Sequence, residues 1–389
     1  MTNETKNVPE LRFKEFSKEW EYNNLKDITT LLKDGTHGTH KNVENGPWLL
    51  SAKNIKNNTI NISDEDRKIS ITDYNKIYKN YTLEREDILL SIVGTIGRVS
   101  MVKDPVNIAF QRSVAIIRFS KPLESKFFLY LFGTKEFKKK LYRNQVVSAQ
   151  PGIYLGDLAK FNIIYPLIIE EQQKIGEFFS KLDQQIELEE QKLSLLEEQK
   201  KGYMQKIFSQ ELRFKDENGN DYPEWEIKKL MQIAKVKTGS KNVQDNIQDG
   251  KYKFFDRSVE VKYLNTFDFD ETAIIYPGEG SKFLPRYFSG KYSLHQRAYS
   301  IYDININNNY LYYYLSLQNN HFLKYAVGST VKSLRMSGFD KLKVMVPKNS
   351  EQEKIGSFFK NLDEFIEKQA NKVELLKQRK QSFLQKMFV

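Results

Sequence analysis

Residues 171–208 read EQQKIGEFFSKLDQQIELEEQKLSLLEEQKKGYMQKIF, and residues 351–388 repeat them as EQEKIGSFFKNLDEFIEKQANKVELLKQRKQSFLQKMF. The two copies align without gaps at an offset of 180 residues, and nearly half of the positions are identical. Neither copy contains proline, and its apolar residues alternate in steps of three and four, which is typical of a long heptad helix. These positions are Ile175, Phe179, Leu182, Ile186, Leu193, Leu196, Tyr203 and Ile207, and Ile355, Phe359, Leu362, Ile366, Val373, Leu376, Phe383 and Met387.

The polar seam positions of the two helices predict how they pair. Parallel pairing in register would set Lys200 against Lys380, so we expect an antiparallel pair; the alternative is that each helix packs only on its own domain. Gly176 and Gly356 lie early in the helices, where glycine is unfavourable, and this predicts close packing against the backbone there. Ser350 with Glu353 has the spacing of a capping box for the second helix.

Shorter repeats surround the helices and give the domain order. Residues 11–14 (LRFK) with Trp20 recur as residues 212–215 with Trp225, and residues 110–119 (FQRSVAIIRF) resemble residues 295–304 (HQRAYSIYDI). We expect a globular domain over 1–165, a helix over 166–210, a second globular domain over 211–347 and a second helix over 348–389. This cyclic order places the beginning of the chain near its end.

Composition limits the function classes. The 389 residues contain 61 Lys and Arg against 50 Asp and Glu, a net charge of +11 that favours an anionic partner such as nucleic acid or a membrane surface. Cysteine is absent, which excludes disulfides, thiolate catalysis and Cys-ligated metals. No apolar run has the length of a membrane span, and the polar start MTNETKNVPE is unlike a signal peptide, so we expect a cytoplasmic protein without membrane insertion.

The globular domains alternate short β-like runs with turns and small helices. Residues 88–102 predict two strands around Gly94 and Gly97, and residues 113–119 predict another. A single basic helix is expected from about Ser125 to Tyr142, and the Tyr-rich segment 309–326 takes its place in the second domain. In that segment, Tyr312, Tyr313 and Tyr314 are expected to be core. The domains share a plan but have diverged much further than the helices.

Catalytic motifs are missing. The sequence has no P-loop, no adenine-methyltransferase motif with two prolines and no GxGxxG after a strand, while the isolated GxG at 278–280 indicates a turn. Glu260-Val261-Lys262 has the ExK form of some nucleases, but so short a match is common in a charged chain. His37 and His40 lie in a glycine-rich loop and have metal-ligating side chains, but no carboxylate set completes a site, and contact with DNA is the favoured interpretation.

The chain resembles the specificity (S) subunits of type I restriction-modification systems. The resemblance rests on the two helix starts, the loop DGTH, the run SAKNI (51–55), the segment EDILLSIVGTIGR (86–98) and the approach to the second helix over 328–347. The first domain departs from the family's usual approach by reading VSAQPGIYLGDL over 147–158.

This resemblance implies an α+β fold: two globular α/β target-recognition domains separated by two long antiparallel coiled-coil helices, in a pseudo-two-fold cyclic repeat. It also implies that the chain is not an enzyme and binds no cofactor itself. Its expected partners are double-stranded DNA, two modification subunits that use S-adenosylmethionine, and restriction subunits that use ATP and magnesium. Because the domains differ, the DNA site should be split and asymmetric.

Candidate DNA contacts divide into anchors on phosphate and readers of bases. Gln111-Arg112 and Gln296-Arg297 recur at matching places, so phosphate contact or domain scaffolding is expected of them, with a buried Arg pair as the alternative. Other candidate phosphate contacts are Lys138, Lys139, Lys140 and Arg143. Base readers are expected where the domains differ, at Thr36, His37, Thr39, His40, Lys41, Lys53 and Asn54, and at Lys237, Ser240, Lys241, Lys282, Arg286 and His295.

Two alternative functions remain open from the sequence. A coiled-coil interaction scaffold would lack sequence-specific DNA binding, and its basic charge would serve solubility. A fused restriction and methylation enzyme is opposed by the missing catalytic motifs.

Overall fold

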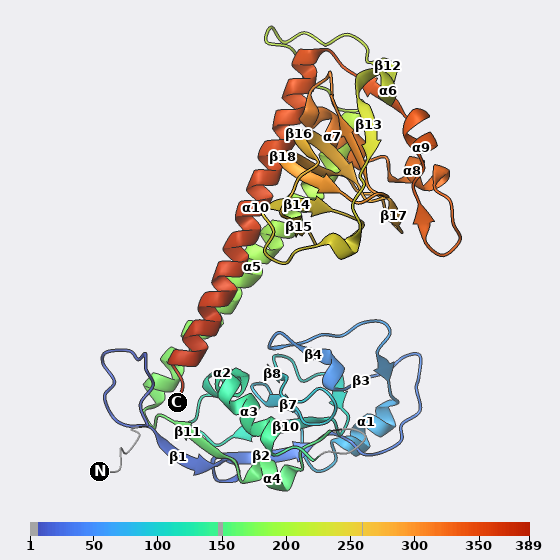
Figure 1. The fold of residues 1–389 in the computed structure, drawn as a ribbon. Coiled ribbons are helices and arrows are strands. Elements are labelled where there is room, and N and C mark those ends of the chain that lie inside the picture. The colour runs from blue at the N-terminus through green and yellow to red at the C-terminus, as the bar shows by residue number, and fades with distance from the viewer. Residues whose placement is uncertain (1–6, 147–150, 259) are drawn as a thin grey trace. The chain divides into compact units, whose positions relative to one another are not determined.

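The computed structural model describes residues 7–146, 151–258 and 260–389, which form two compact units (Figure 1). Unit 1 comprises Met1–Glu190 and Asn371–Val389, and unit 2 comprises Gln191–Ala370. The predicted helical segments 166–210 and 348–389 correspond to α5 (Ile169–Phe208) and α10 (Asn349–Lys386), and each unit contains part of both helices. Val147–Gln150, at the divergent approach to the first helix, lie outside the described residues.

Unit 1 has short strands and small helices around its part of the two long helices. Its strands are β1 (Glu21–Asn24), β2 (Thr29–Asp34), β3 (Trp48–Leu50), β4 (Ile55–Lys56), β5 (Thr59–Ile60), β6 (Arg67–Lys68), β7 (Ile88–Ser91), β8 (Val99–Met101), β9 (Ile108–Phe110), β10 (Val114–Phe119) and β11 (Asn162–Tyr165). Its short helices are α1 (Ile71–Ile77), α2 (Ser125–Gly133), α3 (Lys135–Arg143) and α4 (Leu155–Ala159). One sheet has the order β2-β10-β7-β8 and another the order β6-β3-β9.

Unit 2 repeats this plan with longer strands. Its strands are β12 (Glu226–Lys229), β13 (Lys235–Thr238), β14 (Tyr252–Phe255), β15 (Lys262–Leu264), β16 (Phe269–Tyr276), β17 (Glu279–Gly280), β18 (Arg286–Leu294), β19 (Tyr299–Tyr302), β20 (Lys332–Ser333) and β21 (Lys343–Val346). Its short helices are α6 (Leu230–Ile233), α7 (Asn308–Ser316), α8 (Asn319–Tyr325) and α9 (Met336–Asp340). The main sheet has the order β13-β19-β16-β18-β14-β15.

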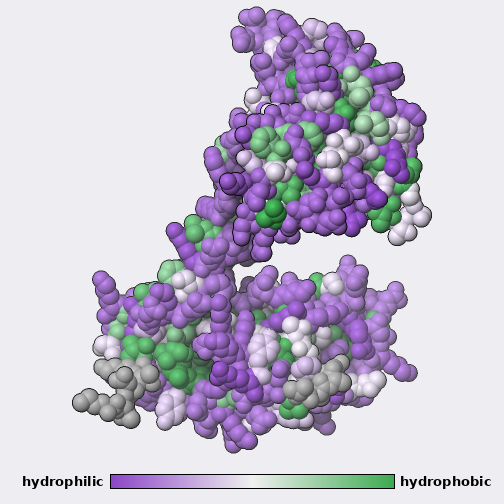
Figure 2. All heavy atoms as spheres, viewed as in Figure 1, coloured by the Kyte–Doolittle hydropathy of each residue, from purple (hydrophilic) through white to green (hydrophobic). Residues whose placement is uncertain are grey.

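One long strand explains why the two units differ in sheet count. In unit 1, β8 pairs with β7 and the separate strand β9 runs parallel to β3. In unit 2, β18 alone pairs with β16 and runs parallel to β14, so the two sheets of unit 1 become one. The face of each unit seen in Figure 2 is mostly hydrophilic, because most large apolar side chains are gathered in the cores between sheets and helices.

The predicted antiparallel helix pair is confirmed within each unit. In unit 1 the Lys380 ammonium pairs with Asp183, and in unit 2 the equivalent Lys200 pairs with Asp363. Each of these carboxylates also accepts a hydrogen bond from a tyrosine of its own domain, at 3.0 Å from Tyr130 and 2.7 Å from the equivalent tyrosine on α7. The alternative in which each helix packs only on its own domain is therefore wrong.

A buried carboxylate joins each helix start to its domain. Glu171 is fully buried and accepts two hydrogen bonds from Arg12, at 2.7 and 2.8 Å, and one from the Trp20 indole at 3.2 Å. Glu351 repeats this arrangement with Arg213 and Trp225. The repeated LRFK…W motif thus supplies the buried partners of the carboxylate.

The next residue of each helix makes a second repeated anchor. The Gln172 amide donates to the Pro166 carbonyl at 2.7 Å, and its oxygen accepts from the backbone N–H of Glu124 at 3.0 Å. Gln352 makes the same two bonds to Pro347 and Asn307. These bonds fix the helix start against the chain that enters α2 or α7.

Two details of the helix prediction are wrong. Ser350 is the second residue of α10 and so cannot be its N-cap; the Lys348 carbonyl accepts the first backbone bonds instead. The expected helix over 125–142 is two helices, because Thr134 has an extended backbone and its hydroxyl accepts from the Phe137 N–H at 3.2 Å, which starts α3.

Close packing at both early glycines is confirmed: a Cβ on Gly356 would lie 2.7 Å from Asn307 Oδ1, and one on Gly176 would lie 2.9 Å from Lys126 Cβ.

The beginning and end of the described chain meet in unit 1, as expected from the cyclic order. The Leu11 N–H donates to the Lys386 carbonyl at 2.8 Å. In unit 2, the equivalent bond runs from Leu212 to Lys206 at 3.0 Å. The same junction is thus built from distant residues in unit 1 and from near neighbours in unit 2.

Candidate nucleic-acid interface

Four loops meet at the same place in each unit, near residues 36, 52, 93 and 112 in unit 1 and near residues 241, 257, 279 and 296 in unit 2. Matching backbone hydrogen bonds show which residues correspond. The N–H groups of Thr36, Gln111 and Arg112 donate to the carbonyls of Phe110, Leu50 and Thr36, respectively. In unit 2 the N–H groups of Lys241, His295 and Gln296 make the same bonds to Leu294, Phe255 and Lys241. This set of loops is called the loop cluster below.

The correspondence corrects the predicted pairing of Gln111-Arg112 with Gln296-Arg297. The loops are shifted by one residue, so Gln111 matches His295 and Arg112 matches Gln296. The shared letters QR therefore do not mark a shared role. A buried Arg pair is also wrong, because Arg112 and Arg297 are both exposed.

The DGTH loop of unit 1 divides into a framework and an exposed part. The His40 ring is 10% exposed; its Nε2 lies 2.9 Å from Thr36 Oγ1 and its Nδ1 lies 3.6 Å from the Asp73 carboxylate. These contacts hold the loop closed. His37 is 64% exposed and pairs with Asp34 at 2.5 Å, while Thr39 and Lys41 are exposed, so these three side chains are placed for contact with a ligand.

Asn54 needs correction as a predicted base reader. It is buried, its amide donates to Asp66 at 2.8 Å and to the Asn61 carbonyl, and its oxygen accepts from the Ser51 N–H. The Lys53 ammonium pairs with the same carboxylate at 2.7 Å. Burial alone would raise the pKa of Asp66, but the bonds from Lys53, Ser63 and Asn54 lower it to about 2. This group holds the loop together.

The basic run on α3 does not form one cationic face. Lys138 is half-buried beside Gly97, and burial, with the charge of Lys380 nearby, lowers its pKa. Lys140 donates to the Asn162 carbonyl at 2.7 Å, and burial lowers its pKa too. Lys139 pairs with Glu136 at 2.6 Å and is exposed, as is Arg143. Among these four, Lys139 and Arg143 are accessible to a phosphate.

Lys237 in unit 2 also needs correction. Its ammonium pairs with Glu271 at 2.5 Å and lies 3.8 Å from the centroids of the Phe269 and Tyr302 rings. Enclosed in this way, it stabilises the sheet and is not available to read a base. Arg286 is likewise engaged, through a bond to the Ser258 carbonyl.

The remaining candidates of unit 2 lie in or near its loop cluster. Lys241 pairs with Asp268 at 3.2 Å, while Ser240 and Lys282 are exposed. His295 accepts a hydrogen bond through Nδ1 from the Arg297 N–H at 3.2 Å, and partial burial lowers its pKa. Gln296 donates to Asn242 at 2.9 Å.

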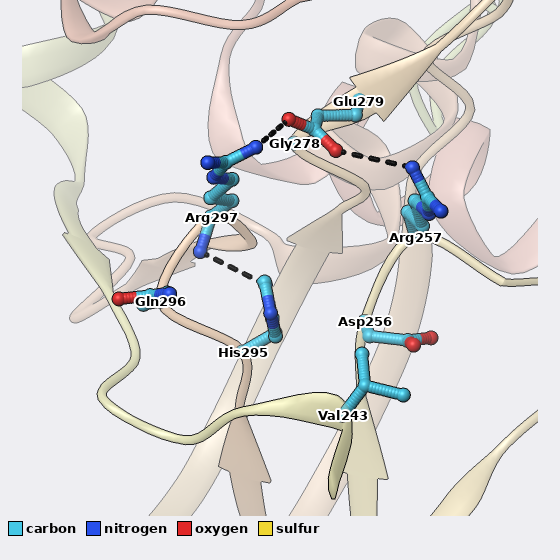
Figure 3. A pocket seen from close by; sticks show the side chains of 8 residues that line it. All are labelled: Val243, Asp256, Arg257, Gly278, Glu279, His295, Gln296 and Arg297. Atoms are coloured by element: carbon cyan, nitrogen blue, oxygen red, sulfur yellow. Dashed lines mark hydrogen bonds and ion pairs between the residues drawn. The ribbon is translucent and has the colours of Figure 1, made fainter.

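A pocket of about 280 Å³ opens in this loop cluster (Figure 3). Its lining residues are Val243, Asp256, Arg257, Gly278, Glu279, His295, Gln296 and Arg297. Burial would raise the pKa of Asp256, but the bonds from Lys262 and Ser258 lower it, so this lining residue is a carboxylate.

Sequence reasoning missed Arg257 and Glu279 as pocket residues. They come from different loops, so no local sequence pattern links them. Their indication is the difference from unit 1, which has the uncharged residues Ala52 and Val93 at the matching positions.

The ExK nuclease hypothesis gains no support: the Lys262 ammonium pairs with Asp256. No group of three or more metal-ligating side chains occurs within residues 7–146, 151–258 and 260–389. Within the same ranges, no helix is long and apolar enough to cross a membrane.

Comparisons with known proteins agree with this architecture. The chain is 28% identical over 162 residues to the type I restriction enzyme EcoDI specificity subunit of Escherichia coli, covering 42% of this chain and 36% of that protein. It is 29% identical over 265 residues to the MjaIX specificity subunit of Methanocaldococcus jannaschii, covering 64% and 58%. The chain thus spans about a third to three fifths of the length of these relatives.

Solved structures share the fold over nearly the whole chain. The S subunit of a type I restriction-modification system from M. genitalium has a TM-score of 0.64 at 16% identity, with 98% of this chain and 99% of that chain covered. A chain from a study of complex assembly and conformational transition of the type I R-M system has a TM-score of 0.57 at 13% identity, with 95% and 97% covered.

The family model of the type I restriction modification DNA specificity domain matches residues 17–198 and 222–378. These two matches include both loop clusters and most of both long helices. The chain therefore belongs to the family of type I restriction modification DNA specificity proteins.

Proposed function

We propose that this chain is the specificity subunit of a type I restriction-modification complex, a non-catalytic component that reads a split, asymmetric DNA sequence. Each domain would read one half of the site with its loop cluster. Its exposed cations would contribute a phosphate term that does not depend on sequence.

One observation carries this proposal: the two domains share a backbone and differ in the side chains that this backbone presents. Equivalent loops make the same hydrogen bonds, yet Thr36, Gln111 and Arg112 are replaced by Lys241, His295 and Gln296. The anchors to the helices, by contrast, are repeated residue for residue at Glu171 and Glu351. A constant scaffold with two different reading surfaces suits two different half-sites.

The proposed complex would contain two modification subunits, which use S-adenosylmethionine to methylate adenine, and restriction subunits, which use ATP and magnesium. This chain would hold none of these cofactors and would act in the cytoplasm with its partners on double-stranded DNA. The relatives named above are specificity subunits, which supports this division of labour.

Genome-wide mapping of N6-methyladenine in host DNA tests the proposal. We expect a split, asymmetric methylated motif in cells that carry this chain, and its disappearance when the gene is deleted. A motif that persists after deletion would contradict the proposal. The same map reports both half-sites and their spacing.

Duplex binding separates this function from that of a coiled-coil scaffold. For the assembled complex, the affinity should fall steeply with salt and should favour one split sequence over a scrambled duplex. Binding that depends on neither salt nor sequence would favour the scaffold.

A further inference from the structure

The loop cluster of unit 2 contains two arginine side chains that share one carboxylate. Glu279 is 13% exposed, and its two oxygens are shared: Oε1 pairs with Arg297, and Oε2 lies 3.3 Å from Arg257 Nη1. Figure 3 shows the two guanidinium groups converging on Glu279 from opposite sides. Each arginine side chain is 65% exposed, so both are held in place yet remain open to solvent.

The carboxylate acts as a positioning residue for the two guanidinium groups. In each ion pair the arginine donates through Nη1, and its other N–H donors take no part in that pairing. The hydrogen bond from Arg297 keeps the pKa of Glu279 low, so the carboxylate stays ionised. Glu279 is itself fixed by the pairing of β17 with β20.

The equivalent residues of unit 1 carry no charge at all. The Leu334 N–H donates to the Gly278 carbonyl as the Ile153 N–H donates to the Ile92 carbonyl, so Glu279 corresponds to Val93. By the loop correspondence above, Arg257 matches Ala52 and Arg297 matches Ser113. The same scaffold positions thus hold Ala, Val and Ser in one domain and Arg, Glu and Arg in the other.

We infer that Arg257 and Arg297, positioned by Glu279, each read a guanine in the half-site bound by the second domain. A guanidinium group donates two parallel hydrogen bonds to guanine O6 and N7, the commonest specific contact in the major groove. A phosphate anchor should be useful in both domains, but this group occurs in only one. A carboxylate between the arginines also repels phosphate, whereas it accepts hydrogen bonds from base amino groups. This inference rests on the proposed function.

The experiment determines the target of the complete complex with wild-type chain and with variants, by selection from a random duplex library and by N6-methyladenine mapping. For Arg297→Ala, or for Arg257→Ala, we expect the preference for one guanine of one half-site to fall about tenfold to a hundredfold. The other half-site should keep its sequence. Glu279→Gln should reduce the same preference, because both arginines lose their shared partner.

Conservative variants distinguish base reading from phosphate contact. Arg297→Lys and Arg257→Lys keep the positive charge but lose the planar fork, so they should keep overall affinity and still lose the preference for guanine. Lys228→Ala, on β12 of the same domain, removes a positive charge outside the loop cluster and should leave the sequence preference unchanged.

Three outcomes would count against the inference. A uniform loss of affinity across all sequences, with a shallower salt dependence, would make the arginines phosphate anchors. An unchanged target in all the variants would also overturn it. A wild-type complex without any split target would overturn the proposed function and this inference together, so the two failures are distinguishable.

Discussion

Two fully buried glutamates, Glu171 and Glu351, each receive an arginine and a tryptophan from a segment far away in sequence. Such a pair is costly to break, because the partner that remains is charged and poorly solvated. These buried hydrogen bonds therefore stabilise the packing of each domain against its helix.

Replacing the buried glutamate should unfold unit 2 readily. We expect Glu351→Ala to lower the free energy of unfolding by about 3–5 kcal/mol, because Arg213 and Trp225 lose their acceptor. Glu353→Ala, two residues further along α10 at an exposed position, should change it by less than about 0.5 kcal/mol. Denaturant unfolding measures both; a large loss for Glu353→Ala would restore the capping-box interpretation.

The carboxylate of Asp66 predicts a pH dependence of stability in unit 1. Its pKa is about 2 in the folded protein, below the ordinary 3.8, so its stabilisation is complete above about pH 4 and is lost as pH falls towards 2. Asp66→Asn should lower the melting temperature at pH 7, and its difference from wild type should shrink between pH 4 and 2. A difference that stays constant with pH would contradict this assignment.

At the scale of elements, two glycines of the long helices differ in how closely other residues pack against them. A Cβ at Gly356 would meet Asn307 Oδ1 at 2.7 Å and a backbone nitrogen at 3.1 Å, whereas nothing lies within 4 Å of one at Gly202. The first glycine is needed for the close approach of α7, and the second is not.

Matched glycine variants test this difference. Gly356→Ala should destabilise unit 2 by about 1–3 kcal/mol through overpacking, despite the better helix propensity of alanine. Gly202→Ala should instead be neutral or stabilising by up to about 1 kcal/mol. Thermal unfolding compares the two; stabilisation by both would mean that α7 yields without cost.

The elements also show what sequence could and could not predict. Heptad spacing predicted both long helices, and their antiparallel direction followed because parallel pairing in register would set Lys200 against Lys380. In the structure each of these lysines pairs with a carboxylate. The prediction of a single helix from about Ser125 to Tyr142 missed the break at Thr134, where a single side chain competes with helix continuation. The sequence did not reveal the one-residue shift between the loops of the two domains, because Gln-Arg occurs in both loops. The backbone hydrogen bonds align different residues from those that the shared letters suggest.

The site was less predictable than the elements. Side-chain type suggested Lys237 and Asn54 as base readers. The orientation of its strand places Lys237 among aromatic rings, and the closure of its loop buries Asn54. The Arg257–Glu279–Arg297 group joins three separate loops, and no local spacing indicates it.

At the scale of the whole molecule, the two domains should be exchangeable. Replacing residues 211–347 by the corresponding domain of another specificity subunit should change one half-site and leave the other intact, because each domain has its own anchors at Glu171 or Glu351. Methylation mapping gives the result. A change in both half-sites would mean that the domains read DNA jointly.

The paired helices should set the spacing between half-sites. Inserting one heptad into each helix adds about 10 Å of helix, which corresponds to about three base pairs of B-DNA. The spacer of the methylated motif should lengthen accordingly. An unchanged spacer would refute the role of the helices as a ruler.

The junction between Leu11 and Lys386 has a consequence for synthesis of the protein. Domains generally fold in the order in which the ribosome makes them. Unit 2 finds the equivalent partner, Lys206, six residues before Leu212, whereas unit 1 needs the end of α10, from Asn371 onward, which is translated after all of unit 2. The domain that is made first is therefore completed last, and until then its core lacks the apolar contacts with Leu384 and Phe388.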